Sequence, residues 1–497
     1  MSAAGRENQN GHDPVTSSSS SADIILSLPS SLRVVSLNCW GLKFISKYRH
    51  ERLTEIGNQL ATASPAPEIV GLQECWTQQD FLKIRELTRH ILPYGKFYWS
   101  GVFGGGLAIL SKWPIEESSM FRYPLNGRPA AFWRGDWYVG KGVACARIRI
   151  GKREKDVVEV FCTHLHAPYE KEPNDSYICH RTAQAWEIAK LMRHAAERGH
   201  SVLGLGDFNM VPMSLAHRII EGHSPVEDIW RKVWPDSALG SAENKDEKER
   251  GRPVPTAKAC LEEHGATCDS KFNTWRWSKQ MQKDLFKGKD STIDPDIPDP
   301  KAKRLDYIFF HDNGSQYAIE SAQVGMTVRH PTLKCSLSDH FSIETTLTRK
   351  PSNQPSTTPK PFVRPLDPST YNLIQTMIKS YDARERQQRK YQIGHFWASL
   401  AVSVGCLVAV WWSPRNYVAF ILMLLSTLGL ASGVLDGLMG FLFVKTELRA
   451  LKEFKFEIDQ AAGRAKQATG SRGGGGAAGL DEKLEEARRS REDVVDS

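Results

Sequence analysis

The sequence predicts an α/β domain built as a two-sheet sandwich, followed by a transmembrane hairpin of two helices near the C-terminus. Two observations support this prediction. Residues 32–349 contain many short apolar runs of β type, which alternate with helical and turn-rich segments. Further along, two long stretches almost free of charged side chains flank a short polar turn.

The strands of the sandwich are predicted from short runs rich in apolar and β-branched residues. One helix is predicted over residues 180–198, where apolar side chains recur at helical spacing. The polar segment 236–303 is dense in Lys, Asp, Glu and Pro, so we expect long loops there, with residues 271–275 as the best-ordered part. The predicted strands are residues 33–37, 69–72, 107–110, 143–146, 157–163, 201–205, 306–310 and 341–347.

Segments of biased composition mark both ends of the domain. Residues 1–31 are rich in Ser, Asn and Gly, and their short apolar patch follows no basic region as it would in a signal sequence. We expect them to be disordered. Residues 350–370 carry closely spaced prolines, which favour an extended linker.

The bulk composition restricts the partners only broadly. A net charge of +8 suits an anionic partner, such as nucleic acid, a membrane surface or a phosphorylated substrate. The nine cysteines are scattered and form no CxxC pair, which disfavours a disulfide framework or a structural zinc site. A reducing compartment is therefore expected.

Residues 396–412 and 417–443 are predicted to cross a membrane as a hairpin. At 1.5 Å per residue they would be roughly 25 and 40 Å long, against a hydrocarbon core of about 30 Å. Trp411 and Trp412 before the turn and Tyr417 after it resemble an interfacial belt. The alternative is a pair of buried core helices, against which this belt argues.

Basic residues set the expected orientation of the hairpin. They gather in the juxtamembrane segment 371–395 and in the charged tail 444–497, whereas the turn holds Arg415 alone. Both termini should therefore face the cytosol. The short first span fits a thin bilayer, such as the endoplasmic reticulum or another internal membrane. Asp436 in the second span is expected to face the other helix or an interface, because a charge against lipid is costly.

Polar residues follow or open several predicted strands, where the fold alone gives them no task. Singly they have structural explanations, as turn formers, a helix-start carboxylate or a buried histidine. Together they offer hard oxygen donors and two imidazoles from distant parts of the chain, which metal-assisted phosphoester cleavage requires and which Mg²⁺ prefers. These residues are Asn38, Glu74, His164, Asp207, Asn209, Asp306, Asp339 and His340.

The order of the motifs resembles a known superfamily. N-C-W-G, L-Q-E, T-H-L-H, G-D-F-N, R-L-D-Y-I-F and S-D-H are similar to motifs of the endonuclease, exonuclease and phosphatase superfamily, over roughly residues 33–348. The resemblance implies the four-layer α-β-β-α sandwich of the DNase I-like fold. It also implies metal-dependent hydrolysis of a phosphoester.

The resemblance assigns roles to individual residues of this chain. Glu74 matches the main Mg²⁺ ligand, with Asn38 beside it, and Asp339 lies near the metal. His340 matches the general base, held by a carboxylate that resembles Asp306. Three further residues match groups that orient water, bind the phosphate or stabilise the phosphoryl group: Asp207, Asn209 and His164. Independently, an imidazole with a pKa near 6.5 and a carboxylate partner suits proton abstraction at cytosolic pH.

The complete layout is similar to that of eukaryotic neutral sphingomyelinases and fungal inositol phosphosphingolipid phospholipases C. Residues 135–142 (GDWYVGKG) resemble the P-loop-like segment of that group, whose aspartate and lysine correspond to Asp136 and Lys141. A nucleotide-binding P-loop would end in Lys-Ser or Lys-Thr and open a helix, so no nucleotide is expected. A loop whose lysine approaches a lipid phosphate, with Trp133 and Trp137 at the interface, fits better than an ordinary hairpin turn.

This second resemblance implies a phospholipase C reaction on a membrane sphingolipid, either sphingomyelin or an inositol phosphosphingolipid. Ceramide and a phosphorylated head group would be the products, with Mg²⁺ as cofactor and anionic phospholipids as activators. The alternatives are a phosphoinositide phosphatase on the same fold, an endonuclease, which would need no hairpin, and an inactive membrane scaffold. No nucleic acid partner is expected. The head group is left open, because it depends on a few loop side chains, around residues 169–177 or 272–275.

Overall fold

A computed structural model describes residues 28–170, 174–289, 291–312, 317–350 and 362–470. The expectations for the N-terminal lead-in, most of the linker and the end of the tail therefore lie largely outside the described residues. The strands are β1 (Ser31–Asn38), β2 (Ile69–Gln73), β3 (Tyr94–Tyr98), β4 (Leu107–Ser111), β5 (Ile115–Arg122), β6 (Gly142–Arg149), β7 (Val157–His164), β8 (Ser201–Asp207), β9 (Glu227–Asp228), β10 (Asp306–His311), β11 (Tyr317–Gly325) and β12 (Ser342–Arg349). The α-helices are α1 (Arg49–Thr62), α2 (Gln78–Thr88), α3 (Asp136–Val139), α4 (Ile178–Glu197), α5 (Leu215–His223), α6 (Ile229–Val233), α7 (Lys245–Glu249), α8 (Ala257–Glu262), α9 (Lys279–Phe286), α10 (Pro368–Ala409), α11 (Asn416–Leu438) and α12 (Val444–Gly470).

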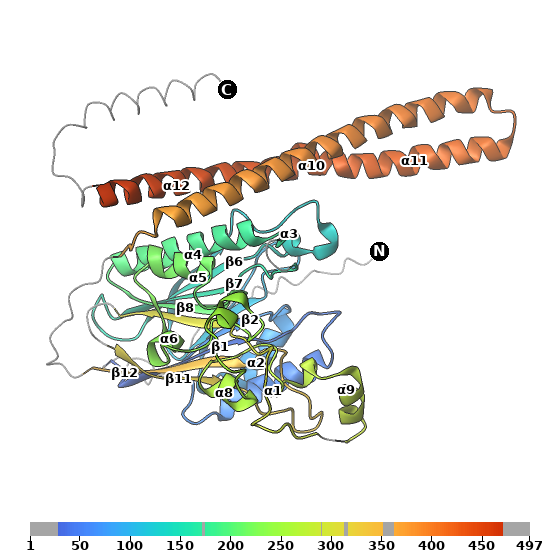
Figure 1. Cartoon of the computed structure of the whole chain (residues 1–497). Helices are drawn as coiled ribbons and strands as arrows, with labels where there is room; N and C mark the ends of the chain where they lie inside the picture. Colours follow the sequence, from blue (N-terminus) through green and yellow to red (C-terminus); the bar gives the residue numbers. More distant parts are fainter. Residues whose placement is uncertain (1–27, 171–173, 290, 313–316, 351–361, 471–497) are drawn as a thin grey trace, which may run out of the picture.

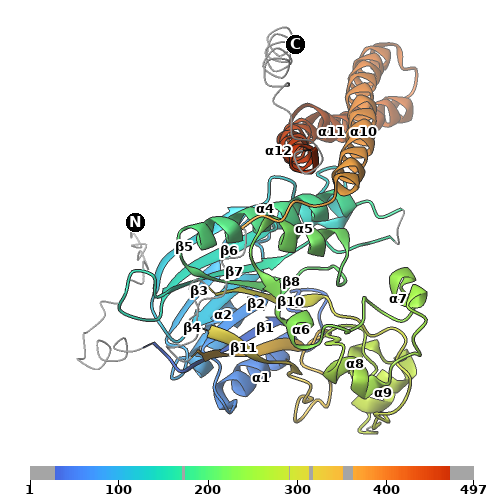
Figure 2. The same cartoon turned by 60° about the vertical axis from the view of Figure 1, so that its left-hand side comes forward.

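The strands form two sheets of six, which pack face to face (Figures 1 and 2). The first sheet has the order β11-β12-β1-β2-β4-β3 and the second β5-β6-β7-β8-β10-β9. At the centre of each sheet two strands run parallel, β1 with β2 and β7 with β8, whereas the other pairs are antiparallel. The carboxyl ends of these four central strands lie at one end of the sandwich, where the polar motifs follow them.

Helices cover both outer faces, which completes the four-layer α-β-β-α sandwich that the sequence predicts. Alternation along β1 shows the packing: Val34 lies in the core between the sheets, whereas Val35 packs under α1 and α2. On the other sheet, Phe161 and Phe309 pack under α4 and α5. The predicted α/β class is thus confirmed.

All eight predicted strands are present, and the predicted helix corresponds to α4. The strands that the sequence did not predict, β3, β5, β9 and β11, are the four edge strands of the two sheets. β5 and β11 have many half-buried or exposed side chains. The polar segment 236–303 holds three short α-helices besides its loops, because Asn244, Thr256 and Ser278 cap their N-termini through side-chain hydrogen bonds.

Residues 368–470 are more helical than the sequence suggests. α10 is a single helix that contains both the basic juxtamembrane segment and the first predicted span. α12 returns alongside it, and together with the first part of α10 it packs against α4 (Figure 1). We call these two helical parts, residues 368–395 and 444–470, the stalk. Its buried face includes Ile374, Tyr381, Leu451 and Phe454.

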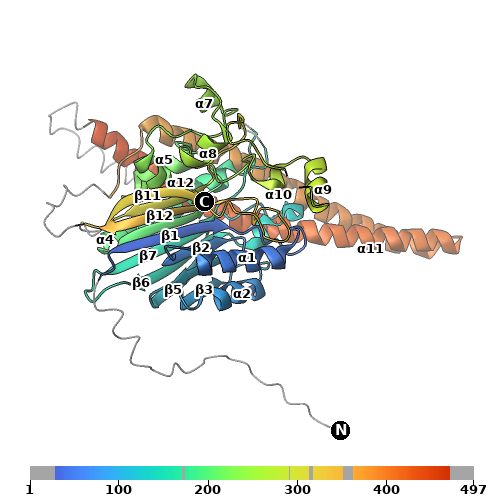
Figure 3. The same ribbon diagram turned by 90° about the horizontal axis from the view of Figure 1, so that it is seen from below.

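Beyond the stalk, α10 and α11 form the predicted hairpin and project past the end of the sandwich (Figures 1 and 3). Two helices, Pro368–Trp412 and Asn416–Gln467, contain windows long and apolar enough to cross a membrane, and only 11% of each window is buried. This low burial disfavours the alternative of core helices. Small residues allow close approach of the two helices, and Ser403 and Ser426 are 2.7 Å apart between their hydroxyl oxygens. Asp436 faces the other helix, as expected, with its Oδ2 2.6 Å from His395 Nδ1.

Candidate active site

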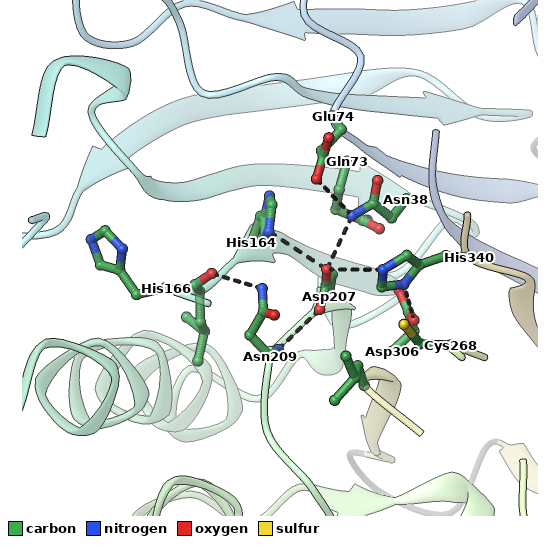
Figure 4. A network of polar contacts seen from close by, with 12 residues as sticks. Asn38, Gln73, Glu74, His164, His166, Asp207, Asn209, Cys268, Asp306 and His340 are labelled. Carbon is green, nitrogen blue, oxygen red and sulfur yellow. Dashed lines mark hydrogen bonds and ion pairs between the residues drawn. The ribbon is translucent and has the colours of Figure 1, made fainter. Parts of the chain in front are cut away.

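The predicted site residues meet at the end of the sandwich where the four central strands finish (Figure 4). Strand pairing explains this meeting. In the first sheet, Asn38 is paired with Gln73, so Glu74 follows directly beside Asn38. In the second sheet, Asp207 has His164 as its partner on one side and Asp306 on the other. We call the residues grouped here the pocket: Asn38, Glu74, His164, Asp207, Asn209, Asp306 and His340.

Asn38 connects the carboxylates of the two sheets. Its Nδ2 donates to Glu74 Oε1 at 3.1 Å and to Asp207 Oδ2 at 3.0 Å, while its Oδ1 accepts from the backbone N–H of Trp40. The amide thus orients both carboxylates through its nitrogen. Glu74 adopts a φ of 52°, in the left-handed region that non-glycine residues rarely use. Such local strain clusters at functional sites, where it fixes the direction of a side chain.

His340 and Asp306 form a buried hydrogen-bonded pair. His340 Nδ1 lies 2.8 Å from Asp306 Oδ2, which fixes the ring, and its Nε2 lies 3.9 Å from Asp207 Oδ2. Ser338 fixes the position of residues 338–340. Its hydroxyl donates to the carbonyl of Asn38 and accepts from the backbone N–H of His340. The histidine of the S-D-H motif is therefore held against the end of β1.

His164 and Asn209 occupy the opposite side of Asp207. His164 Nε2 lies 3.5 Å from Asp207 Oδ2. The backbone N–H of Asn209 donates to Asp207 Oδ1 at 2.9 Å, and its side-chain Nδ2 donates to the carbonyl of Leu165 at 3.1 Å. Asn209 has a φ of 46°, so it too turns its side chain through a left-handed residue. Asp207 is thereby contacted by Asn38, His164, Asn209 and His340.

Burial and neighbouring charges raise the pKa of some pocket residues and lower that of others. Burial, and then the charge of Asp306, raise the pKa of Asp207 to about 7. Burial lowers the pKa of His340, but the carboxylates of Asp306 and Asp207 outweigh it and hold that pKa well above its usual range. His164 goes the other way, since burial and the nearby Lys141 ammonium hold its pKa well below 6.5. The two imidazoles of the pocket therefore have pKa shifts of opposite sign.

The donor atoms of the pocket fit a divalent cation. Ligand atoms of Asp207, Asp306 and His340 lie within 4.8 Å of one another. Among the residues that the structure describes, two buried carboxylate oxygens of the pocket, Glu74 Oε2 and Asp306 Oδ1, find no hydrogen-bond partner. Unpartnered buried carboxylate oxygens are costly, and a hard cation is the usual way to satisfy them. Burial, and then the charge of Asp339, raise the pKa of Glu74. A bound cation would favour the ionised form of this carboxylate.

Asp136 and Lys141 lie behind the pocket rather than at its surface. Lys141 Nζ donates to the carbonyl of Leu165 at 3.1 Å, and its charge acts on Glu74 and Asp207. Asp136 is buried at the start of α3, with Oδ1 3.6 Å from His166 Nδ1. Gly142 then begins β6, as the residue pattern predicts. The segment is therefore no exposed hairpin turn, and its two charged side chains face the interior.

Three further polar residues lie near the site and were not singled out by the sequence: Asp269, Arg276 and Lys303. Asp339 lies at the mouth of the pocket, 3.6 Å from Arg276 Nη2, and Arg276 Nε contacts Asp269 at 2.9 Å. Lys303 Nζ also contacts Asp269, at 2.7 Å. Arg276, Asp269 and Lys303 belong to or border the polar insertion, whose composition resembles any solvated loop. Backbone pairing of Cys268 with both Lys303 and His340 brings them here, and no local signal shows it.

Buried carboxylates and two imidazoles with opposite pKa shifts, at the joint end of two sheets, are the arrangement of a metal-assisted phosphoesterase. A model of the Endonuclease/Exonuclease/phosphatase family matches residues 35–340, and the chain belongs to this family. Enzymes of this family are metal-dependent. As an enzyme, the chain is a hydrolase that acts on phosphoric diester bonds.

Individual relatives are similar over most of the chain. The chain is 41% identical to an inositol phosphosphingolipids phospholipase C of Schizosaccharomyces pombe, over 88% of this chain and 95% of the relative. It is 32% identical to the Saccharomyces cerevisiae protein of the same name, over 86% and 89%. It is 27% identical to human sphingomyelin phosphodiesterase 2, over 88% and 92%. Because these alignments cover 86–88% of the chain, they extend beyond the sandwich into the C-terminal helices.

Proposed function

We propose that the chain is a Mg²⁺-dependent phospholipase C that hydrolyses inositol phosphosphingolipids or sphingomyelin, leaving ceramide in the bilayer. The observation that carries this proposal is the pair His340–Asp306, held at 2.8 Å beside Asp207 and Glu74. The names of the relatives favour a sphingolipid over other phosphodiesters. The hairpin brings the pocket to a membrane, where such lipids reside.

His340 is proposed as the general base. Its Nε2 takes a proton from water while Asp306 holds Nδ1, so the water oxygen can attack phosphorus. The bond from phosphorus to the ceramide oxygen then breaks, and that oxygen takes a proton from solvent. Asp207 orients the water beside His340 Nε2, and Asn209 fixes the direction of Asp207 through its backbone N–H.

His164 is proposed to stabilise the phosphoryl group. Because its pKa is held well below 6.5, the ring is neutral and donates a hydrogen bond without losing its proton. Lys141 adds positive charge behind it. Asp136 and Lys141 therefore act by positioning the pocket electrostatically, from the interior side.

Glu74 is proposed as the principal Mg²⁺ ligand, since it offers a buried oxygen without a partner. Asn38 turns Nδ2 toward Glu74 and so orients this carboxylate. When bound, a divalent cation neutralises charge that develops on phosphoryl oxygens, and it lowers the proton affinity of nearby His340 through its own charge. Asp339, whose charge acts on Glu74, is proposed to lie near the cation.

The membrane arrangement follows from the same reasoning. We propose a two-pass protein with both termini in the cytosol, in the endoplasmic reticulum or another internal membrane. Basic residues of the stalk would attract anionic phospholipids, at around 1 kcal/mol for each residue near an anionic leaflet. We accordingly propose these lipids as activators, and neither nucleic acid nor nucleotide as a partner.

Purified protein in detergent provides the test. Radiolabelled inositol phosphosphingolipid, sphingomyelin, phosphatidylinositol phosphate and duplex DNA are offered separately, with Mg²⁺ or with a chelator. We expect water-soluble phosphorylated head group from a sphingolipid, in Mg²⁺ only. Free phosphate from the phosphoinositide, or cut DNA without lipid cleavage, would favour the alternative hydrolases. No product from any substrate would point to an inactive scaffold.

A further inference from the structure

Three loops around the mouth of the pocket carry large apolar side chains that point into solvent. They are residues 39–48, 99–106 and 124–141. Surface patches of this kind mark an interaction site, whereas isolated exposed apolar residues do not. We call the following set the apolar rim: Phe44 (90% exposed), Ile45 (70%), Trp99 (65%), Val102 (76%), Phe103 (61%) and Trp133 (72%).

Each of these loops is hydrogen-bonded either to a pocket residue or to the residue that directly follows one in the chain. The N–H of Gly41 donates to the carbonyl of Glu74, and the N–H of Cys75 donates to the carbonyl of Gly106, both at 2.9 Å. The third loop ends in Lys141, which contacts the carbonyl of Leu165 directly after β7. The loops that carry the apolar rim therefore border the pocket.

The apolar rim continues to the base of the membrane hairpin. The N–H of Val102 donates to the carbonyl of Tyr138 at 2.7 Å, which joins the second loop to the third. The ring of Trp137, next to it, lies 5.0 Å from that of Phe443, the last residue of the second predicted span. Figures 1 and 3 both show the hairpin projecting beyond the end of the sandwich that carries α3. The entrance thus faces the side on which the hairpin enters its bilayer.

The chemistry of these loops suits a lipid surface. Residues 39–48 and 99–106 contain no aspartate or glutamate, although the chain has 57 acidic residues. Lys43 and Lys47 flank Phe44 and Ile45, and a mixture of lysine and aromatic side chains is typical of protein segments that lie in the headgroup region. Surfaces that bind another protein more often carry hydrogen-bonding or acidic groups beside their exposed apolar side chains.

We propose that the apolar rim seats the catalytic domain on the leaflet that its own hairpin enters, so that the enzyme hydrolyses lipids in cis, within the membrane that anchors it. This inference rests on the proposed lipid substrate. The hairpin supplies attachment, while the rim sets the orientation of the entrance against the bilayer. Substrate then reaches the pocket from the plane of the same membrane rather than from a facing one.

Two vesicle populations test the cis requirement. Purified full-length protein is reconstituted in vesicles that contain labelled sphingolipid, or in vesicles without it that are mixed with separate substrate vesicles. We expect head-group release to be at least tenfold faster when protein and substrate share a membrane. Equal rates would overturn the proposal.

Paired variants then test the rim itself. Phe44→Ser with Phe103→Ser should slow hydrolysis in the shared vesicles about tenfold or more, and leave hydrolysis of detergent-dispersed substrate unchanged. Leu82→Ser on α2, which is 49% exposed on the outer layer, is the matched control and should change neither. Unchanged vesicle activity in the double variant, or an equal loss in detergent, would refute a membrane role for the rim.

A readout without catalysis separates this inference from the proposed function. Vesicles containing a lipid with a photoreactive group near its headgroup are irradiated, and labelled peptides are mapped by mass spectrometry. Labels on residues 39–48 and 99–106, but not on α2, are expected even if no substrate is ever cleaved. Absence of labels from both loops would refute the membrane role of the apolar rim. Labels without hydrolysis would refute the proposed phospholipase C activity alone.

Discussion

Two buried histidine–carboxylate pairs of this molecule have nearly the same geometry and opposite electrostatics. In the pocket, His340 Nδ1 lies 2.8 Å from Asp306 Oδ2. Between α4 and the stalk, His180 Nε2 lies 2.8 Å from Glu447 Oε1, and the hydroxyl of Tyr381 contacts both. The pKa of His340 is held well above its usual range, whereas that of His180 is lowered to about 3.

The surroundings of each pair explain this difference. His340 faces a second carboxylate, Asp207, so the pocket favours the charged ring. His180 is fully buried, and the guanidinium groups of Arg384 and Arg128 oppose its charge. Burial also raises the pKa of Glu447 to about 8, so at neutral pH this pair is a hydrogen bond between neutral groups. A hydrogen-bonded histidine–carboxylate pair therefore does not by itself determine the reactivity of the histidine. The neighbouring charged groups and access to substrate determine it.

Removal of the pocket histidine should have the largest effect. His340→Gln is expected to lower kcat about 10²- to 10⁴-fold, because the general base is lost. His180→Gln, the matched change in the other pair, should leave kcat within a few-fold. Head-group release by detergent-solubilised protein measures both. If the two variants lost activity equally, the proposed distinction between the pairs would be wrong.

Glu74→Gln should weaken cation binding. The neutral amide keeps the shape but loses the charge, so the Mg²⁺ concentration for half-maximal activity should rise by about 10- to 100-fold. Calorimetric titration with Mn²⁺ measures the same change without catalysis. Glu447→Gln, which alters a buried carboxyl of similar size outside the pocket, should leave the titration unchanged. Normal cation affinity in Glu74→Gln would exclude this residue as the principal ligand.

Tyr381→Phe should loosen the stalk without touching the pocket. The hydroxyl contacts His180 and Glu447, so its loss removes a buried hydrogen bond, at a cost of about 0.5–1.5 kcal/mol. Hydrogen exchange in α12 measures the change. Tyr391→Phe, on an exposed ring of α10, is the control and should have no effect. Unaltered protection in Tyr381→Phe would show that this hydrogen bond does not hold α12 in place.

The pH dependence of the same contact should be smaller and has a defined sign. Because the pKa of Glu447 is raised from 4.5 to about 8, the docked stalk holds a proton that the free carboxyl releases, and docking weakens as pH rises toward 8. Because the pKa of His180 is lowered from 6.5 to about 3, docking also weakens as pH falls below 6.5. The two slopes cancel between about 4.5 and 6.5.

Glu447→Gln isolates the first of these slopes. The amide does not titrate, so exchange protection of α12 in this variant should stay constant between pH 6.5 and 8, where that of the wild type declines. An identical decline in both proteins would assign the pH dependence to another group.

The two pairs also show what the sequence could predict. The pocket residues interrupt apolar runs, so their positions at strand ends, and hence their meeting, follow from the strand pattern. Glu447 and Tyr381 lie in charged helices, where a polar residue that becomes buried has the same appearance as a solvated one. Their burial depends on packing against α4, far away in the chain, and no local pattern shows it.

The fold divides in the same way. Central strands such as β2 and β8 are continuous apolar runs and were predicted, whereas the edge strand β5 has polar side chains along much of its length and was not. The short helices of the insertion begin at side-chain caps and show little apolar periodicity.

Hydrolysis in water enriched in ¹⁸O tests the central claim most directly. The proposed chemistry places the water oxygen on phosphorus and breaks the bond to ceramide. Mass spectrometry of the products from an inositol phosphosphingolipid or sphingomyelin should therefore find ¹⁸O in the phosphorylated head group and none in ceramide. Label in free inorganic phosphate, a phosphorylated ceramide among the products, or no product at all would contradict it.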